Sequence, residues 1–283
     1  MVHVGTIGRI GRGLLFAALA VYLLLPLSAV LLSSLATTWT ANALPDGYTL
    51  ASWGEALANP RLQAAVARTF GLALAVLALD LLLVVPAVYW QRVRNPRIRV
   101  VTELCAAIPF VLPFIVIAFG ILKLAGFALP ELLGTPPLLL LGHAAIAFPF
   151  LYWSVDGAMA AANVVKLNEA AQMCGATPLQ TLRHVIVPNI GPGLATGGML
   201  VFATSFGEFA LVQVLVGARF ENVSLYSLDL LTRTSADFGT LAVLTVLTFL
   251  VLFVISTAVV WINRGRRVAA VAGARAMTAE KDR

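Results

Sequence analysis

The chain has 283 residues, of which 60% are hydrophobic and 11% are charged, and its mean hydropathy is +0.93. Soluble domains carry about a quarter charged residues to cover their exterior, so this composition excludes a water-soluble globular protein. The net charge of +6 does not indicate a nucleic-acid partner, because the basic residues form short clusters between apolar stretches and make no continuous basic face.

Six apolar stretches are long enough to cross a membrane. A transmembrane helix needs about 20 predominantly apolar residues, because every backbone N–H and C=O must be paired within the segment. The first stretch is too long for the core of a cleavable signal peptide, so we expect it to remain as a span. The predicted fold class is therefore an all-α polytopic membrane protein with six transmembrane helices. The stretches are 14–36, 64–90, 101–125, 136–157, 194–217 and 240–262.

The distribution of Lys and Arg predicts the orientation of these spans. With a cytoplasmic N-terminus, the inner segments hold fourteen basic residues and the other side holds five. We therefore expect segment 1–13 and the basic tail 263–283 to be cytoplasmic, on either side of a membrane domain over 14–262, and the tail to be disordered. The inner residues are Arg9, Arg12, Arg92, Arg94, Arg97, Arg99, Lys166, Arg183, Arg264, Arg266, Arg267, Arg275, Lys281 and Arg283; the outer residues are Arg61, Arg68, Lys123, Arg219 and Arg233.

The inner segment 158–193 is too long for a simple turn and is predicted to form a helix, a break and a second helix. Good helix formers from Glu169 to Cys174 lead into Gly175, the residue type best able to adopt the left-handed conformation that closes a helix. Thr177 is then the expected N-cap of the second helix, with Pro178 at its first position.

The second helix has a predicted capping box, since Gln180 stands three residues after Thr177, and Pro188 is expected to end it. Leu179, Leu182 and Ile186 recur at helical spacing and give it one apolar stripe. Such a helix can dock into a groove of another protein or lie on the membrane surface, and the periodicity alone leaves both alternatives open.

Glu169-Ala170-Ala171, then Gly175 after three residues, then Val185-Ile186-Val187-Pro188 after nine more, resembles the EAA motif of ABC importer permeases. The likeness implies the type I importer (MetI-like) permease fold, with the loop as a coupling element set into an ATPase subunit. The implied ATPase-coupling residues are Glu169, Ala170, Ala171, Gly175, Leu179, Leu182, Ile186 and Pro188.

The resemblance extends beyond the loop, to permeases of the polyamine, ferric iron, thiamine and sulfate type. It rests on Arg68-Thr69-Phe70, on Pro109 and Pro113, and on Ser205-Phe206-Gly207-Glu208-Phe209. It implies residence in the bacterial inner membrane, a dimer of cytoplasmic ABC ATPases, a second permease subunit, identical or homologous, and an extracytoplasmic solute-binding protein. ATP and Mg²⁺ are then bound by the ATPase, because this chain has no G-x-x-x-x-G-K-[ST] phosphate loop.

Two acids lie in the middle of predicted spans, where a charge costs about 2.5 to 3.5 kcal/mol. We place Glu208 in a substrate path with Ser205 and Gln213, and leave Asp80 open between that path and a structural contact. These acids favour a small polar or cationic solute such as a polyamine, thiamine or iron, although anions such as a phosphonate or sulfate have similar permeases. The rival interpretation is an ATP-independent secondary transporter or channel that uses Asp80 and Glu208 as ion sites.

Catalytic and metal sites are not indicated. Cys105 and Cys174 have no CxxC or Cys/His spacing, and no Ser/His/Asp or metal-ligand grouping involves the histidines. Asp156 and Glu103 fall near the inner ends of their spans, where a solvated or salt-bridged role is expected. The chain is thus predicted to be a translocation subunit and not an enzyme.

Overall fold

The computed structural model describes residues 3–39, 42–232 and 237–281, and within these it describes only the backbone of 3–10, 262 and 264–281. Regular secondary structure in these residues is helical. The long helices are α1 (His3–Ser34), α3 (Pro60–Val93), α4 (Arg99–Val111), α5 (Phe114–Ala128), α6 (Pro136–Ala161), α10 (Gly191–Gly207) and α13 (Phe238–Lys281). The shorter ones are α2 (Ala51–Ala58), η1 (Pro96–Ile98), η2 (Pro130–Leu132), α7 (Val164–Met173), α8 (Pro178–Gln180), η3 (Thr181–Ile186), α9 (Val187–Asn189), α11 (Ala210–Leu215), η4 (Gly217–Phe220) and α12 (Val223–Thr232).

Within the described residues, four helices are long and apolar enough to cross a membrane, and two bent helix pairs raise the number to six if each pair counts as one span. The four lie at Gly11–Ser34, Pro60–Val93, Pro136–Ala161 and Phe238–Trp261, and the pairs are Pro96–Val111 with Phe114–Ala128 and Pro178–Asn189 with Gly191–Gly207. The predicted all-α membrane fold is confirmed. Two of the predicted spans, however, are not straight helices.

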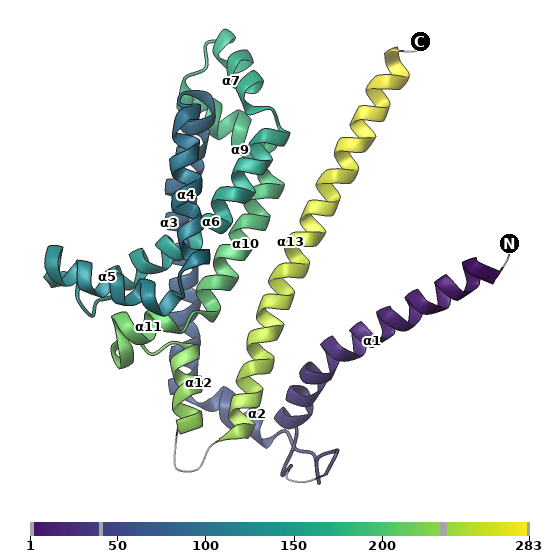
Figure 1. Cartoon of the computed structure of the whole chain (residues 1–283), viewed down its shortest axis with the longest axis vertical. Coiled ribbons are helices and arrows are strands. Elements are labelled where there is room, and N and C mark those ends of the chain that lie inside the picture. Colours follow the sequence, from purple (N-terminus) through teal and green to yellow (C-terminus); the bar gives the residue numbers. More distant parts are fainter. Residues whose placement is uncertain (1–2, 40–41, 233–236, 282–283) are drawn as a thin grey trace. The chain divides into compact units, whose positions relative to one another are not determined.

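The third predicted span, 101–125, is broken in the middle. Leu112 is extended (φ −103°, ψ 137°) and Pro113 follows it, so α4 and α5 meet at an angle of 114°. A residue before proline is driven out of the helical region by the proline ring, which explains the break. In Figure 1, α5 accordingly runs across the direction of α3, α4 and α6.

The fifth predicted span, 194–217, is also two helices. α10 ends at Gly207, Glu208 is extended (φ −72°, ψ 131°), and α11 begins at Ala210 and packs on α5. The Glu208 carboxylate accepts the backbone N–H of Leu211 at 2.8 Å, and the Asn222 amide donates to the Glu208 carbonyl at 3.1 Å. Side-chain groups thereby replace hydrogen bonds that the break removes from the helix, as a membrane interior requires.

The chain divides into two compact units. One comprises the residues up to Gln63 with Tyr226–Val251, and in it Arg61 pairs with Asp229 at 2.7 Å. The other comprises Ala64–Leu225 with the segment from Leu252 onward. The second unit contains the main hydrophobic core, built largely on α3 and α6 with a smaller share from α11.

Close packing of small residues joins α6 to α10. A Cβ atom on Gly193 would lie 2.4 Å from the Ala158 Cβ, and one on Gly197 would lie 2.8 Å from the Ser154 Cβ. The Ser154 hydroxyl also donates to the Gly193 carbonyl at 2.8 Å. Small residues that let two backbones approach are a common means of helix association in membranes. The α6–α10 pair, which we call the stem, is therefore tightly packed and holds both ends of the segment between the two helices.

The last helix differs from the prediction. We expected 263–283 to be a tail without helical pattern, whereas α13 continues to Lys281. The sequence past Asn263 contains no proline and is rich in Ala and Arg, strong helix formers that outweigh the two glycines, Gly265 and Gly273.

Candidate functional site

The α6–α10 loop, residues 162–190, begins with a sharp reversal. Asn163 has a positive φ of 51°, and α7 starts at the next residue. Asn tolerates this left-handed conformation better than most residues. Val164 and Asn168 form the buried face of α7, while Glu169 and Ala170 are exposed. α7, which lies at one end of the bundle in Figure 1, therefore exposes Glu169 and Ala170 and buries Val164 and Asn168.

The break after α7 has the predicted geometry. Gly175 has φ 81°, its N–H donates to the Gln172 carbonyl at 2.9 Å, and the Ala176 N–H donates to the Ala171 carbonyl at 3.1 Å. These two bonds define a Schellman motif, in which the residue at the Gly175 position must be left-handed. The prediction that Gly175 closes the first helix is confirmed.

The second helix begins as the sequence predicts but continues differently. The Thr177 hydroxyl accepts the Gln180 N–H and the Gln180 side chain accepts the Thr177 N–H, which confirms the capping box. Thereafter η3 is a π-helix, and α9 continues past Pro188 to Asn189. The helix therefore ends at Asn189, one residue after the predicted stop at Pro188.

The predicted apolar stripe does not form one surface. Leu179 is 72% exposed, Leu182 is half-buried against the core, and Ile186 is fully buried. The wider turn of η3 directs the later residues into the bundle. Ile186 therefore anchors the second helix, and only Leu179 of the three is fully available to another protein.

The exposed tip of the α6–α10 loop, which we call the loop tip, contains Glu169, Ala170, Met173, Gly175 and Leu179. Met173 is 84% exposed and was missed by the sequence analysis. It lies one turn after Glu169 on the same face of α7, and this i, i+4 spacing is the signal that could have identified it. Of the remaining predicted coupling residues, Pro188 is exposed and Ala171 is half-buried.

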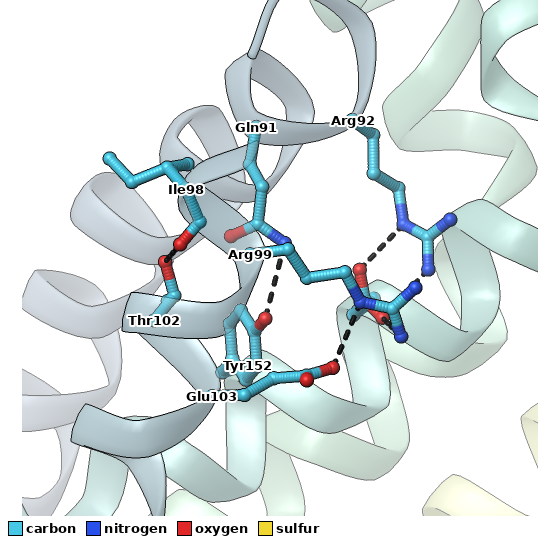
Figure 2. Close-up of polar contacts among 8 residues, drawn as sticks. Gln91, Arg92, Ile98, Arg99, Thr102, Glu103 and Tyr152 are labelled. Carbon is cyan, nitrogen blue, oxygen red and sulfur yellow. Dashed lines mark hydrogen bonds and ion pairs between the residues drawn. The ribbon is translucent and has the colours of Figure 1, made fainter. Parts of the chain in front are cut away.

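A polar cluster lies at the end of the bundle beside the loop. Arg92 of α3 makes two hydrogen bonds to the Asp156 carboxylate of α6, at 2.6 and 2.7 Å. Arg99 of α4 bonds to Glu103 at 2.9 Å and lies 3.5 Å from Asp156. Figure 2 shows Arg92 and Arg99 converging there, next to the bond from Gln91 to the Tyr152 hydroxyl. The salt-bridged role expected for Asp156 and Glu103 is confirmed, and the cluster ties three helices together.

Replacing Asp156 with alanine is expected to destabilise the protein by about 3 kcal/mol, because it leaves the largely buried Arg92 without its bidentate partner. The Arg92 and Asp156 side chains are only 19% and 9% exposed. Glu103→Ala is the matched control, since its pair with Arg99 is about half exposed and an exposed pair is worth less than about 1 kcal/mol. Thermal unfolding in detergent, followed by tryptophan fluorescence, measures both; equal losses would contradict the assignment of Asp156 as the centre of the cluster.

The predicted substrate-path residues do not all line one cavity of the described structure. Asp80 is 2% exposed and lines a cavity of about 510 Å³ between α3, α4 and α6. Among the described residues, this cavity includes none of Ser205, Glu208 and Gln213 in its lining. Ser205 and Glu208 are buried and Gln213 is exposed. The structure therefore does not bring Asp80 together with the other three.

These features define a class of protein: a polytopic α-helical membrane protein in which a helix–Schellman turn–helix element projects from a tight pair of spans. Residues 87–268 match the family model described as "Binding-protein-dependent transport system inner membrane component". The chain belongs to that family and is a permease subunit of an ABC importer, a membrane translocation component and not an enzyme.

Two relatives and one solved structure illustrate the similarity. A Streptomyces antibioticus protein assigned as an ABC transporter permease, ORF1, is 32% identical over 61% of this chain and 74% of its own length. The protein PhnV of Salmonella typhimurium, assigned as a 2-aminoethylphosphonate transport system permease, is 27% identical over 74% of this chain and 78% of its own. A bacterial ABC transporter for the acidic polysaccharide alginate has the same fold, with a TM-score of 0.73, 19% identity and coverage of 92% and 97%.

Proposed function

We propose that the loop tip docks into a cytoplasmic ABC ATPase and passes its movement to the spans, while the chain forms the solute path with a second permease subunit. The loop tip carries this proposal, because Met173 and Leu179 are 84% and 72% exposed on either side of a rigid turn. Large apolar side chains fixed in water mark an interaction surface. Glu169 beside them adds a negative charge with which a basic side chain of the partner can form an ion pair.

The distribution of basic residues supports a cytoplasmic loop and cytoplasmic termini. Arg92, Arg94, Arg97 and Arg99 lie at the same end of the bundle as the polar cluster and the loop. The side chains of Arg9, Arg233 and the basic residues from Arg264 onward, which also entered the count, lie outside the described residues. A binding protein on the opposite side is the delivery partner that we infer from family membership.

We further propose a small solute with an oxyanion group, such as a phosphonate or sulfate. The relative PhnV, by its name, serves 2-aminoethylphosphonate transport. Glu208, one of the two acids that favoured a cation, accepts a hydrogen bond that begins α11, so it has a structural use without any solute. Because its carboxylate is already engaged in this hydrogen bond, Glu208 is a poor ion site for the rival ATP-independent transporter.

Charge reversal at Glu169 is expected to release the ATPase. The chain, tagged and purified from native membranes in mild detergent, should bring a nucleotide-hydrolysing subunit with it, and Glu169→Lys should lose that subunit because it reverses the charge of the loop tip. Glu131→Lys is the control, an equal reversal at an exposed acid between α5 and α6. Retention of the ATPase by Glu169→Lys would refute docking at this site.

The solute class has its own test. Cells lacking the chain should lose ATP-dependent uptake of radiolabelled 2-aminoethylphosphonate or sulfate, and the intact gene should restore it. Loss of polyamine or thiamine uptake with both oxyanions unaffected would show that the solute is a cation, without altering the permease assignment.

A further inference from the structure

In the part of the chain that the structure describes, the end of α3 beside the loop makes three side-chain links to other helices. Gln91 donates to the Tyr152 hydroxyl at 3.1 Å and Arg92 binds Asp156, and both of these partners belong to α6. The third link is different: the Tyr89 hydroxyl donates to Asn168 Oδ1 of α7 at 2.6 Å. α3 is thus hydrogen-bonded to the helix that carries Glu169.

This third bond is buried. Tyr89 is 8% exposed and Asn168 is 4% exposed, although Asn168 immediately precedes the exposed Glu169. Among the described residues, it is the one hydrogen bond from an α7 side chain to a spanning helix; the other bond of Asn168, from Gln172 at 3.5 Å, stays within α7. Separating Tyr89 from Asn168 would leave the buried Tyr89 hydroxyl unpaired and Asn168 Oδ1 with only the 3.5 Å bond from Gln172, which is more costly than sliding one apolar surface over another.

The other attachments of α7 include the packing of Val164 in the core and the turns at its two ends. Its start follows Asn163 in a left-handed turn, and its end runs into the Gly175 turn. Both turns join α7 to its neighbours in the chain, and through them to α6 and α10 of the stem. The Tyr89–Asn168 bond in the middle of α7 adds a directional link from α7 to α3.

We propose that Tyr89 and Asn168 are positioning residues that make α3 move with α7, so that displacement of the loop tip reaches the bundle through α3 as well as through the α6–α10 stem. This inference rests on the proposed docking of an ATPase at the loop tip. It assigns α3, which is remote from the EAA motif in sequence, a direct part in coupling.

The test measures the distance between α3 and α7 in the purified permease–ATPase complex. Spin labels are placed at Leu82→Cys on α3 and Lys166→Cys on α7, both exposed, with Cys105 and Cys174 changed to serine. Pulsed electron paramagnetic resonance then gives the distance distribution without nucleotide and after trapping with ATP and vanadate. No transported solute is needed.

With Tyr89 intact, we expect the same narrow distribution in both nucleotide states. Tyr89→Phe should broaden the distribution and make it shift between the states, and adding Asn168→Ala should change nothing more, because both substitutions break the same bond. Tyr152→Phe is the matched control: it removes a buried hydroxyl bonded to the same turn of α3 but does not touch α7, so the narrow distribution should persist.

A distance that changes with nucleotide in the unsubstituted complex would overturn the inference, as would a Tyr89→Phe complex that behaves like the unsubstituted one. Absence of any co-purifying ATPase would instead refute the proposed docking. The two failures are therefore distinguished before the distance is measured.

Discussion

Gly175→Val is expected to abolish coupled transport while the protein remains folded in the membrane. Gly175 has φ 81°, a conformation that costs a residue with a Cβ about 1–2 kcal/mol, and a β-branched side chain is a further burden. The Schellman bonds should be lost, and Met173 and Leu179 should no longer be held in one arrangement. ATPase co-purification and ATP-dependent uptake measure the effect.

Gly175→Val should not disturb the packing of the bundle core, because a Cβ at Gly175 meets no atom within 4 Å. Gly157→Val is the control, since Gly157 is exposed near the loop end of α6, has open space around it and has no positive φ. If Gly175→Val retained both the ATPase and uptake, a fixed turn at the loop tip would not be needed for docking.

Gly197→Leu is expected to have a large effect on stability. Its Cβ would lie 2.8 Å from the Ser154 Cβ and 3.2 Å from the Leu151 Cα, so α6 and α10 would be forced apart. Overpacking of a core costs about 1–3 kcal/mol, and here the obstacle includes backbone that cannot turn aside. The unfolding temperature in detergent should fall by several degrees, and the yield of folded protein should fall with it.

Gly71→Leu distinguishes the loss of close packing between α6 and α10 from a change in helix propensity. Gly71 lies within α3, is exposed, and has nothing within 4 Å of its Cβ direction, so the substitution should leave the unfolding temperature unchanged or raise it. Equal losses at Gly71 and Gly197 would show that glycine itself, and not close contact of α6 with α10, is required.

Local rules predicted the loop between α6 and α10 well. Thr177, Gln180 and Gly175 have the predicted roles because capping and left-handed turns depend on a few adjacent residues. Ile186 was misplaced for the opposite reason: periodicity gives the face of a regular α-helix, and the π-turn of η3 changes which way later side chains point.

The predictions for the spans divide in the same way, into features that depend on local sequence and features that depend on packing. Hydropathy located the apolar stretches, because membrane solvation depends on composition. It does not show where a helix within such a stretch bends. Pro113 and the Gly207-Glu208 pair were visible in the sequence, yet only packing of α5 on α11 shows that the chain turns aside there. Tyr89 and Asn168 are 79 residues apart, and no local pattern predicts that their side chains meet.

The most direct measurement is photocrosslinking from the position of Met173 in native membranes. A photoreactive amino acid at this position should yield a covalent adduct of the chain with one nucleotide-binding subunit, and the adduct should disappear in cells that lack that subunit. An adduct with lipid alone, or labelling of this position by a membrane-impermeant reagent added outside the cell, would contradict the account.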